Sequence, residues 1–63
     1  MTNEDKIKQL ELIIMYAQFK LEENSLYSAS IQTQIALNDT REGKPISNNL
    51  ERIVNSYLNK IRN

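Results

Sequence analysis

The sequence predicts an all-α protein, built either as a small three-helix bundle or as a long-helix hairpin that dimerises. Apolar residues recur at spacings of three and four along most of the chain, which is the helical signature. The alternation with period two that marks strands is absent. The only glycine and the only proline, Gly43 and Pro45, lie together in one short charged segment. Helices joined by a single clear loop are therefore expected.

The first helix is expected over residues 4 to 22. Thr2 and Asp5 have the spacing of a capping box, and acidic residues suit the first turn of a helix. Apolar residues recur at Ile7, Leu10, Ile14, Ala17 and Leu21, and the apolar surface is widened by Leu12, Ile13, Met15, Tyr16 and Phe19. A helix that is apolar on most of its girth needs neighbours on more than one side. This helix is expected at the centre of a bundle or at a dimer interface.

The second helix is expected over residues 24 to 39, and it is unusual because residues 24 to 38 carry no charge. Asn24 or Ser25 is a suitable cap for a new helix. The spacing of three and four also continues through Asn24, so one helix from residue 4 to about residue 39 is the alternative. A break at Asn24 favours a compact three-helix domain, whereas a continuous helix favours a dimeric hairpin.

Two interpretations fit the uncharged second helix. Its apolar residues form a candidate core face, with Ser30, Thr33 and Gln34 as neutral surface; the face consists of Leu26, Ile31, Ile35 and Leu37. Alternatively, the helix is a contact face for another protein, since charged groups are depleted at the centres of interfaces.

A loop is expected over residues 40 to 47 and a third helix over residues 48 to 62. Gly43 tolerates positive φ and is a candidate C-cap. Asn48 with Glu51 has capping-box spacing, and Ser47 is a competing cap. One face of the third helix is apolar, formed by Leu50, Ile53, Val54, Tyr57, Leu58 and Ile61.

The composition limits how this chain can be stabilised. Its 63 residues make one domain at most, and they include neither Cys nor His. Disulfides and thiolate metal sites are excluded, and no metal or other cofactor is expected. Small domains without such staples rely on regular helix packing or self-association. We therefore expect a homo-oligomer, most simply a dimer.

Charge and hydropathy also bear on location. Eight basic residues balance eight acidic ones, so there is no general attraction to nucleic acid or to membranes. The longest apolar run, Leu12 to Ala17, is too short to span a bilayer. A cytoplasmic location is expected. Ile, Asn and Lys supply 21 of the 63 residues, a bias typical of AT-rich coding sequence and so of a bacterial or phage source.

The leading functional hypothesis is a non-enzymatic regulator or inhibitor that docks a helical face on a larger protein. Catalysis is disfavoured because there is no His, no Cys and no Gly-rich phosphate loop. Tyrosine and uncharged polar side chains suit interfaces, and nearby loop charges can set orientation. The candidate partner-binding residues are Tyr27, Ser30, Gln34, Arg41, Glu42 and Lys44.

The alternative hypothesis is a nucleic-acid-binding accessory protein or transcriptional regulator. Residues 41 to 63 contain five basic and two acidic residues, so the C-terminal part is locally positive. Asn can read adenine and Arg can read guanine in the major groove. The candidate residues for this function are Asn48, Asn49, Arg52, Lys60 and Arg62. The competing interpretation is that these charges keep a loop and a helix end in water.

Overall fold

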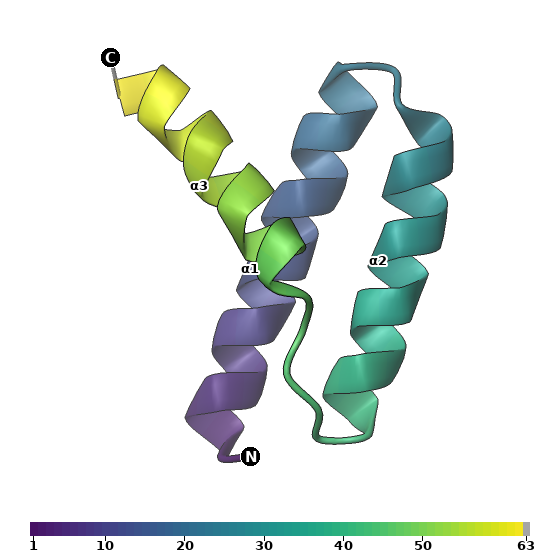
Figure 1. Ribbon diagram of the computed structural model, residues 1–63, viewed down its shortest axis with the longest axis vertical. Coiled ribbons are helices and arrows are strands. Elements are labelled where there is room, and N and C mark those ends of the chain that lie inside the picture. The colour runs from purple at the N-terminus through teal and green to yellow at the C-terminus, as the bar shows by residue number, and fades with distance from the viewer. Residues whose placement is uncertain (63) are drawn as a thin grey trace.

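Three helices make up the fold in the computed structural model, which describes residues 1–62 (Figure 1). They are α1 (Asn3–Glu22), α2 (Leu26–Arg41) and α3 (Asn48–Arg62). The predicted three-helix, all-α fold is confirmed, and the break after α1 excludes the long-helix hairpin. Figure 1 shows α1 and α2 as an antiparallel pair, with α3 crossing α1 and diverging from α2. Within residues 1–62, the backbone of α3 lies close to that of α1 and not to that of α2.

The start of α1 is a complete capping box, as predicted. The Thr2 hydroxyl accepts a hydrogen bond from the Asp5 amide at 3.1 Å, and the Asp5 carboxylate accepts one from the Thr2 amide at 3.3 Å. Hydrogen bonding to Thr2, first from its side chain and then from its backbone, lowers the pKa of Asp5 below its ordinary value of 3.8. The ionised carboxylate also suits the positive end of the helix dipole.

The end of α1 depends on Asn24, which has a φ of 62°. The Asn24 amide donates to the Leu21 carbonyl at 3.0 Å, and the Ser25 amide donates to the Lys20 carbonyl at 2.8 Å. This pair of bonds is a Schellman motif with Asn in the left-handed position. Asn24 therefore ends α1 rather than capping α2. The second helix begins two residues later than predicted, after Ser25, whose side chain makes no capping hydrogen bond.

The end of α2 repeats the same motif with Gly43, which has a φ of 75°. The Gly43 amide donates to the Thr40 carbonyl at 3.1 Å, and the Lys44 amide donates to the Asp39 carbonyl at 2.8 Å. The predicted C-cap role of Gly43 is confirmed. The helix runs to Arg41, two residues beyond the predicted end, because this motif holds its last turn together.

Substitutions at these two positions should have opposite effects. Gly43→Ala is expected to destabilise the fold by about 1 kcal/mol, the usual cost of left-handed backbone for a residue with a Cβ. An added Cβ would meet no atom within 4 Å, so the cost comes from φ alone. Asn24→Gly is expected to stabilise the fold by a few tenths of a kcal/mol, since Gly is the preferred residue there. Thermal unfolding of both variants checks these signs, and a neutral Gly43→Ala would contradict the argument.

The start of α3 uses Ser47, the competing cap in the sequence prediction. Its hydroxyl accepts a hydrogen bond from the Asn49 amide at 3.2 Å. Its carbonyl accepts from the Leu50 amide at 3.1 Å and from the Glu51 amide at 3.4 Å. The helix therefore begins at Asn48, as predicted.

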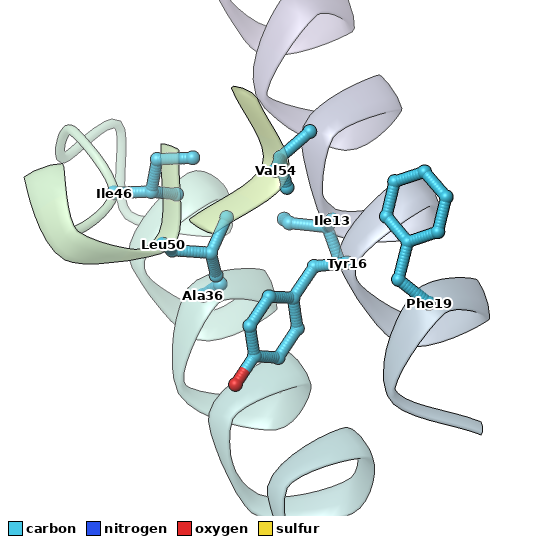
Figure 2. Packing of buried hydrophobic residues seen from close by; sticks show 7 residues of the cluster. All are labelled: Ile13, Tyr16, Phe19, Ala36, Ile46, Leu50 and Val54. Carbon is cyan, nitrogen blue, oxygen red and sulfur yellow. The ribbon is translucent and has the colours of Figure 1, made fainter. Parts of the chain in front are cut away.

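The core lies where α3 crosses α1, as Figure 2 shows. Its buried members are Ile13, Tyr16 and Phe19 of α1, Ala36 of α2, Ile46 of the connector, and Leu50 and Val54 of α3. Val54 is completely buried, and the Phe19 ring stacks on Tyr57 with centroids 4.8 Å apart. Most of the predicted apolar face of α3 is buried or half-buried; only Ile61 is largely exposed.

One of the two interpretations of α2, the candidate core face, is wrong. Leu26, Ile31 and Ile35 are exposed, and Leu37 is only half-buried. The buried residues of α2 are instead small ones, Ala29, Ala36 and Thr40. Small side chains allow two helices to approach closely, so the tight α1–α2 contact leaves the large side chains of α2 outside.

Candidate protein-docking surfaces

The outer face of α2 carries three exposed apolar side chains in one line. Tyr27, Ile31 and Ile35 follow each other at spacings of four, so they are neighbours along one side of the helix. Their side chains are 77%, 38% and 50% exposed. All three belong to the uncharged segment of residues 24 to 38. This set, which we call the α2 stripe, is an apolar surface without charged neighbours in its own helix segment.

The predicted partner-binding residues divide into two groups. Tyr27, Ser30, Gln34 and Arg41 are all exposed on α2, and their spacings of three, four and seven place them along one side of the helix. Glu42 and Lys44 lie in the turn after α2, where their side chains form an ion pair of 2.9 Å. Both of these side chains are more than half exposed. The pair therefore contributes little to stability and stays accessible to a partner.

The most regular apolar pattern in the sequence also lies outside the core. The residues spaced by three and four on α1 include Ile7, Ile14 and Leu21, whose side chains are 54%, 66% and 53% exposed. The buried residues of α1 lie on a different side of the helix, at Ile13, Tyr16 and Phe19. Next to α2, the exposed side of α1 forms an apolar groove. The groove is lined by Leu10, Ile13, Ile14, Ala17, Gln18, Leu21, Thr33 and Leu37.

A second, more polar cleft separates α2 from α3. Its lining residues are Tyr16, Lys20, Ser28, Gln32, Ser47, Asn49, Leu50 and Ile53. The Lys20 ammonium lies 3.5 Å from the Glu23 carboxylate, and it lies 5.8 Å and 5.6 Å from the ring centroids of Tyr16 and Tyr57. Its charge is thus engaged by an ion pair and by cation–π contacts. This cleft offers hydroxyl and amide groups, from Ser28, Gln32, Ser47 and Asn49.

Sequence reasoning missed Gln9, the residue that attaches the connector before α3 to α1. The Gln9 side-chain nitrogen donates to the Thr40 hydroxyl at 2.9 Å and to the Lys44 carbonyl at 3.1 Å. The Gln9 side-chain oxygen accepts from the Ile46 amide at 3.1 Å. No spacing rule marks such a residue, because its partners lie 31 to 37 positions away. Gln9 positions Ile46 in the core and so sets where α3 begins.

The nucleic-acid candidates are only partly brought together. Asn48, Asn49 and Arg52 are exposed on the first turns of α3, and Arg52 neighbours both asparagines because it follows them by four and three residues. Lys60 lies at least eight residues further along the helix, and its ammonium lies 5.6 Å from the Tyr57 ring centroid. The side chain of Arg62 lies outside the described residues. The structure thus leaves three exposed polar residues for this hypothesis.

The fold defines a class of protein: a three-helix protein with an exposed apolar stripe on α2 and an apolar groove between α1 and α2. Comparison with protein-family models, with curated proteins and with solved structures found no match to this chain. Within residues 1–62, no helix is long and apolar enough to cross a membrane. In the same residues, no three acidic side chains gather as the ligands of a metal ion would.

Proposed function

We propose that this protein is a small non-enzymatic regulator or inhibitor that acts in the cytoplasm by docking α2 on a larger protein. One observation supports this proposal above the others. The α2 stripe presents Tyr27, Ile31 and Ile35 to solvent within a helix segment that carries no charge. Exposed apolar side chains in line on a rigid helix are the anchors of helix-in-groove recognition.

The stripe has dimensions that suit such an anchor. Tyr27 and Ile35 are eight residues apart, which is about 12 Å along a helix. The neighbouring side chains at Ser30 and Gln34 are uncharged, so covering them costs less desolvation than covering charged groups would. Glu42 and Lys44 follow at the C-terminal end of α2, where they can orient the docked helix. Tyr27, the most exposed of the three anchors, should contribute most to the affinity.

Photo-crosslinking in the native cell tests this proposal directly. A photoreactive phenylalanine at position 27 is expected to crosslink to one larger protein, whereas the same group at position 55, on exposed Asn55 of α3, is not. Adding Ile35→Asp to the position-27 protein should reduce the crosslinked product at least tenfold, while circular dichroism shows unchanged helix content. Equal crosslinking from positions 27 and 55 would refute the α2 stripe as the docking face.

The nucleic-acid alternative has its own measurement. Exposed Asn48, Asn49 and Arg52 keep this hypothesis open, although the chain carries no net charge. Binding to nucleic acid should weaken steeply with added salt, whereas apolar docking should change little. Loss of the crosslinked product after nuclease treatment, together with a steep salt dependence, would favour the α3 surface over the α2 stripe.

A further inference from the structure

We propose that the polar cleft between α2 and α3 binds a small organic anion, whose phosphate or carboxylate group lies beside Lys20. This site is separate from the α2 stripe, because the α2 residues that line the cleft, Ser28 and Gln32, each follow a stripe residue by one position and so face about 100° away from it. Three features support the site: an unpartnered buried hydroxyl, a positive charge, and a set of hydrogen-bond donors.

All three helices contribute to the cleft. Tyr16 and Lys20 are four residues apart on α1, and Ser28 and Gln32 are four residues apart on α2, so each pair lies on one side of its helix. Ser47 and the first turn of α3 line the remaining side. The cleft has a volume of about 280 Å³, just below the roughly 300 Å³ at which pockets for drug-sized ligands begin. Its size therefore suits a small molecule.

The side chain of Tyr16 carries a hydroxyl group that has no partner in the fold. The residue is only 4% exposed, but within residues 1–62 its hydroxyl makes no hydrogen bond. Figure 2 shows this hydroxyl pointing out of the core cluster, away from Ile13 and Val54. Polar groups of buried side chains normally have a hydrogen-bond partner. Because Tyr16 lines the cleft, a ligand bound there can supply the missing partner.

Lys20 gives the cleft its charge. Among the residues within 1–62 that line the cleft, it is the only charged one. Its ammonium group lies 5.8 Å and 5.6 Å from the ring centroids of Tyr16 and Tyr57, and these cation–π contacts hold it in place. The Lys20 side chain is only 17% exposed, so its charge is partly shielded from water. A negative ligand is therefore the one that this position favours.

The carboxylate of Glu23 does not use up this charge. It lies 3.5 Å from the Lys20 ammonium, and the Glu23 side chain is 40% exposed. Such an exposed pair on one helix contributes little to stability. An ammonium group also has three hydrogens to donate. A bound oxyanion can therefore share the Lys20 ammonium with Glu23.

The start of α3 supplies further positive character. The Ser47 hydroxyl accepts a hydrogen bond from the Asn49 amide at 3.2 Å, and its own hydrogen can be donated to a ligand. The amides of Asn49, Leu50 and Glu51 already bond to Ser47, so α3 contributes the positive end of its dipole rather than free amides. The hydroxyl donors, the Lys20 cation and the helix dipole all favour an oxyanion.

A titration followed by two-dimensional NMR tests the site with three probes built on one scaffold. Glycerol 3-phosphate and glycerate carry the two candidate head groups, and glycerol carries neither. At least one of the two anions is expected to give saturable shifts at the amides of Ser28 and Asn49, with a dissociation constant of about 1 mM, as suits a ligand of few atoms. The anion that binds more tightly identifies the head group. Equal saturation by glycerol, or saturation by neither anion at about 20 mM, would overturn the proposal.

Two lysine variants test whether the cleft itself holds the anion. Lys20→Gln is expected to weaken binding of the tighter probe at least tenfold, because a hydrogen bond to a charged group is lost. Lys60→Gln is the matched control, since it removes the same charge and a similar contact with the Tyr57 ring, at 5.6 Å, but lies outside the cleft. It should leave the dissociation constant within about twofold, because exposed charges are screened by salt. Equal weakening by both variants would refute the site.

Tyr16→Phe tests the unpartnered hydroxyl without removing the buried ring. The variant is expected to weaken binding about fivefold, the loss of one hydrogen bond. Its unfolding temperature should not fall, because the hydroxyl bonds to nothing within residues 1–62. Wild-type binding by this variant, or the same affinity in Lys20→Gln as in the wild-type protein, would show that the anion binds elsewhere.

Discussion

Replacing Ile13 by alanine is expected to destabilise the fold by about 3 kcal/mol, within the usual range for truncating a buried Ile. Ile13 is only 2% exposed, and it packs in the cluster that joins α1 to α3. A chain of this length has a total stability of only about 3 to 9 kcal/mol. Ile13→Ala should therefore leave a substantial fraction of the protein unfolded at 37 °C, as thermal unfolding followed by circular dichroism would show.

The neighbouring residue supplies the control for this prediction. Ile14 is the same amino acid one position later, but its side chain is 66% exposed. Ile14→Ala is expected to change the free energy of unfolding by less than about 0.5 kcal/mol when the protein is dilute enough to be monomeric. Equal effects of the two substitutions would show that α1 faces the core with a different side.

Replacing Gln9 by alanine is expected to cost about 2 to 3 kcal/mol. The substitution removes three hydrogen bonds, each contributing about 0.5 to 1.5 kcal/mol net, and leaves the Ile46 amide without its partner. Because this amide belongs to the connector, the loss should loosen α3 more than the α1–α2 hairpin. Hydrogen exchange should show faster exchange at Ile46 and along α3 than in the wild-type protein.

Two further variants separate the side-chain contacts of Gln9 from the general effects of substitution. Gln34→Ala removes the same side chain from an exposed position of α2 and should stay within about 0.5 kcal/mol of the wild-type stability. Gln9→Glu keeps an acceptor for the Ile46 amide but loses both donated bonds, so its stability should fall between those of Gln9→Ala and the wild type. If Gln9→Ala unfolds like Gln34→Ala, the attachment of the connector to α1 does not depend on Gln9.

Helix content and helix ends were largely predictable because they depend on local interactions. The capping box at Thr2 and Asp5 and the C-cap at Gly43 involve residues three to five positions apart. Asn24 was identified as the decisive position, where the sequence left open a cap at Asn24, a cap at Ser25 and a continuous helix. Asn is favourable both as an N-cap and in left-handed backbone, and the sequence alone does not distinguish these two roles.

The sides of the helices that became buried were less predictable. Apolar residues surround most of α1. Periodicity alone therefore does not show whether the side with Ile7 and Ile14 or the side with Ile13 and Tyr16 faces the core. On α2 the large residues suggested a core face, but Ala29 and Ala36, seven positions apart, are the ones that became buried. That spacing puts both alanines on one side of a helix, and it was the available signal for close packing against α1.

The candidate docking site was predicted in part. Lack of charge in residues 24 to 38 predicted that α2 is a contact helix and that Tyr27 is an exposed anchor, and the structure places the Tyr27 side chain in solvent. Ile31 and Ile35 belonged to a candidate core face in one of two interpretations, and the sequence did not choose between these because the exposure of a large apolar residue depends on its neighbours in space. Whether this surface binds a larger protein stays a prediction.

Sequence by itself determined the all-helical character of the chain, most helix ends and the uncharged character of α2, since these depend on residue type and on contacts within one helical turn. Whether residues 4 to 39 form one helix or two was decided by the structure, which breaks the chain at Asn24. Tertiary structure decided which sides of the helices are covered. That outcome depends on contacts between distant residues, such as Gln9 with Thr40 and Phe19 with Tyr57. Helix α3 covers one side of α1, and the small residues of α2 cover another. The most regular apolar pattern in the chain, which includes Ile7, Ile14 and Leu21 of α1, therefore remains exposed to solvent.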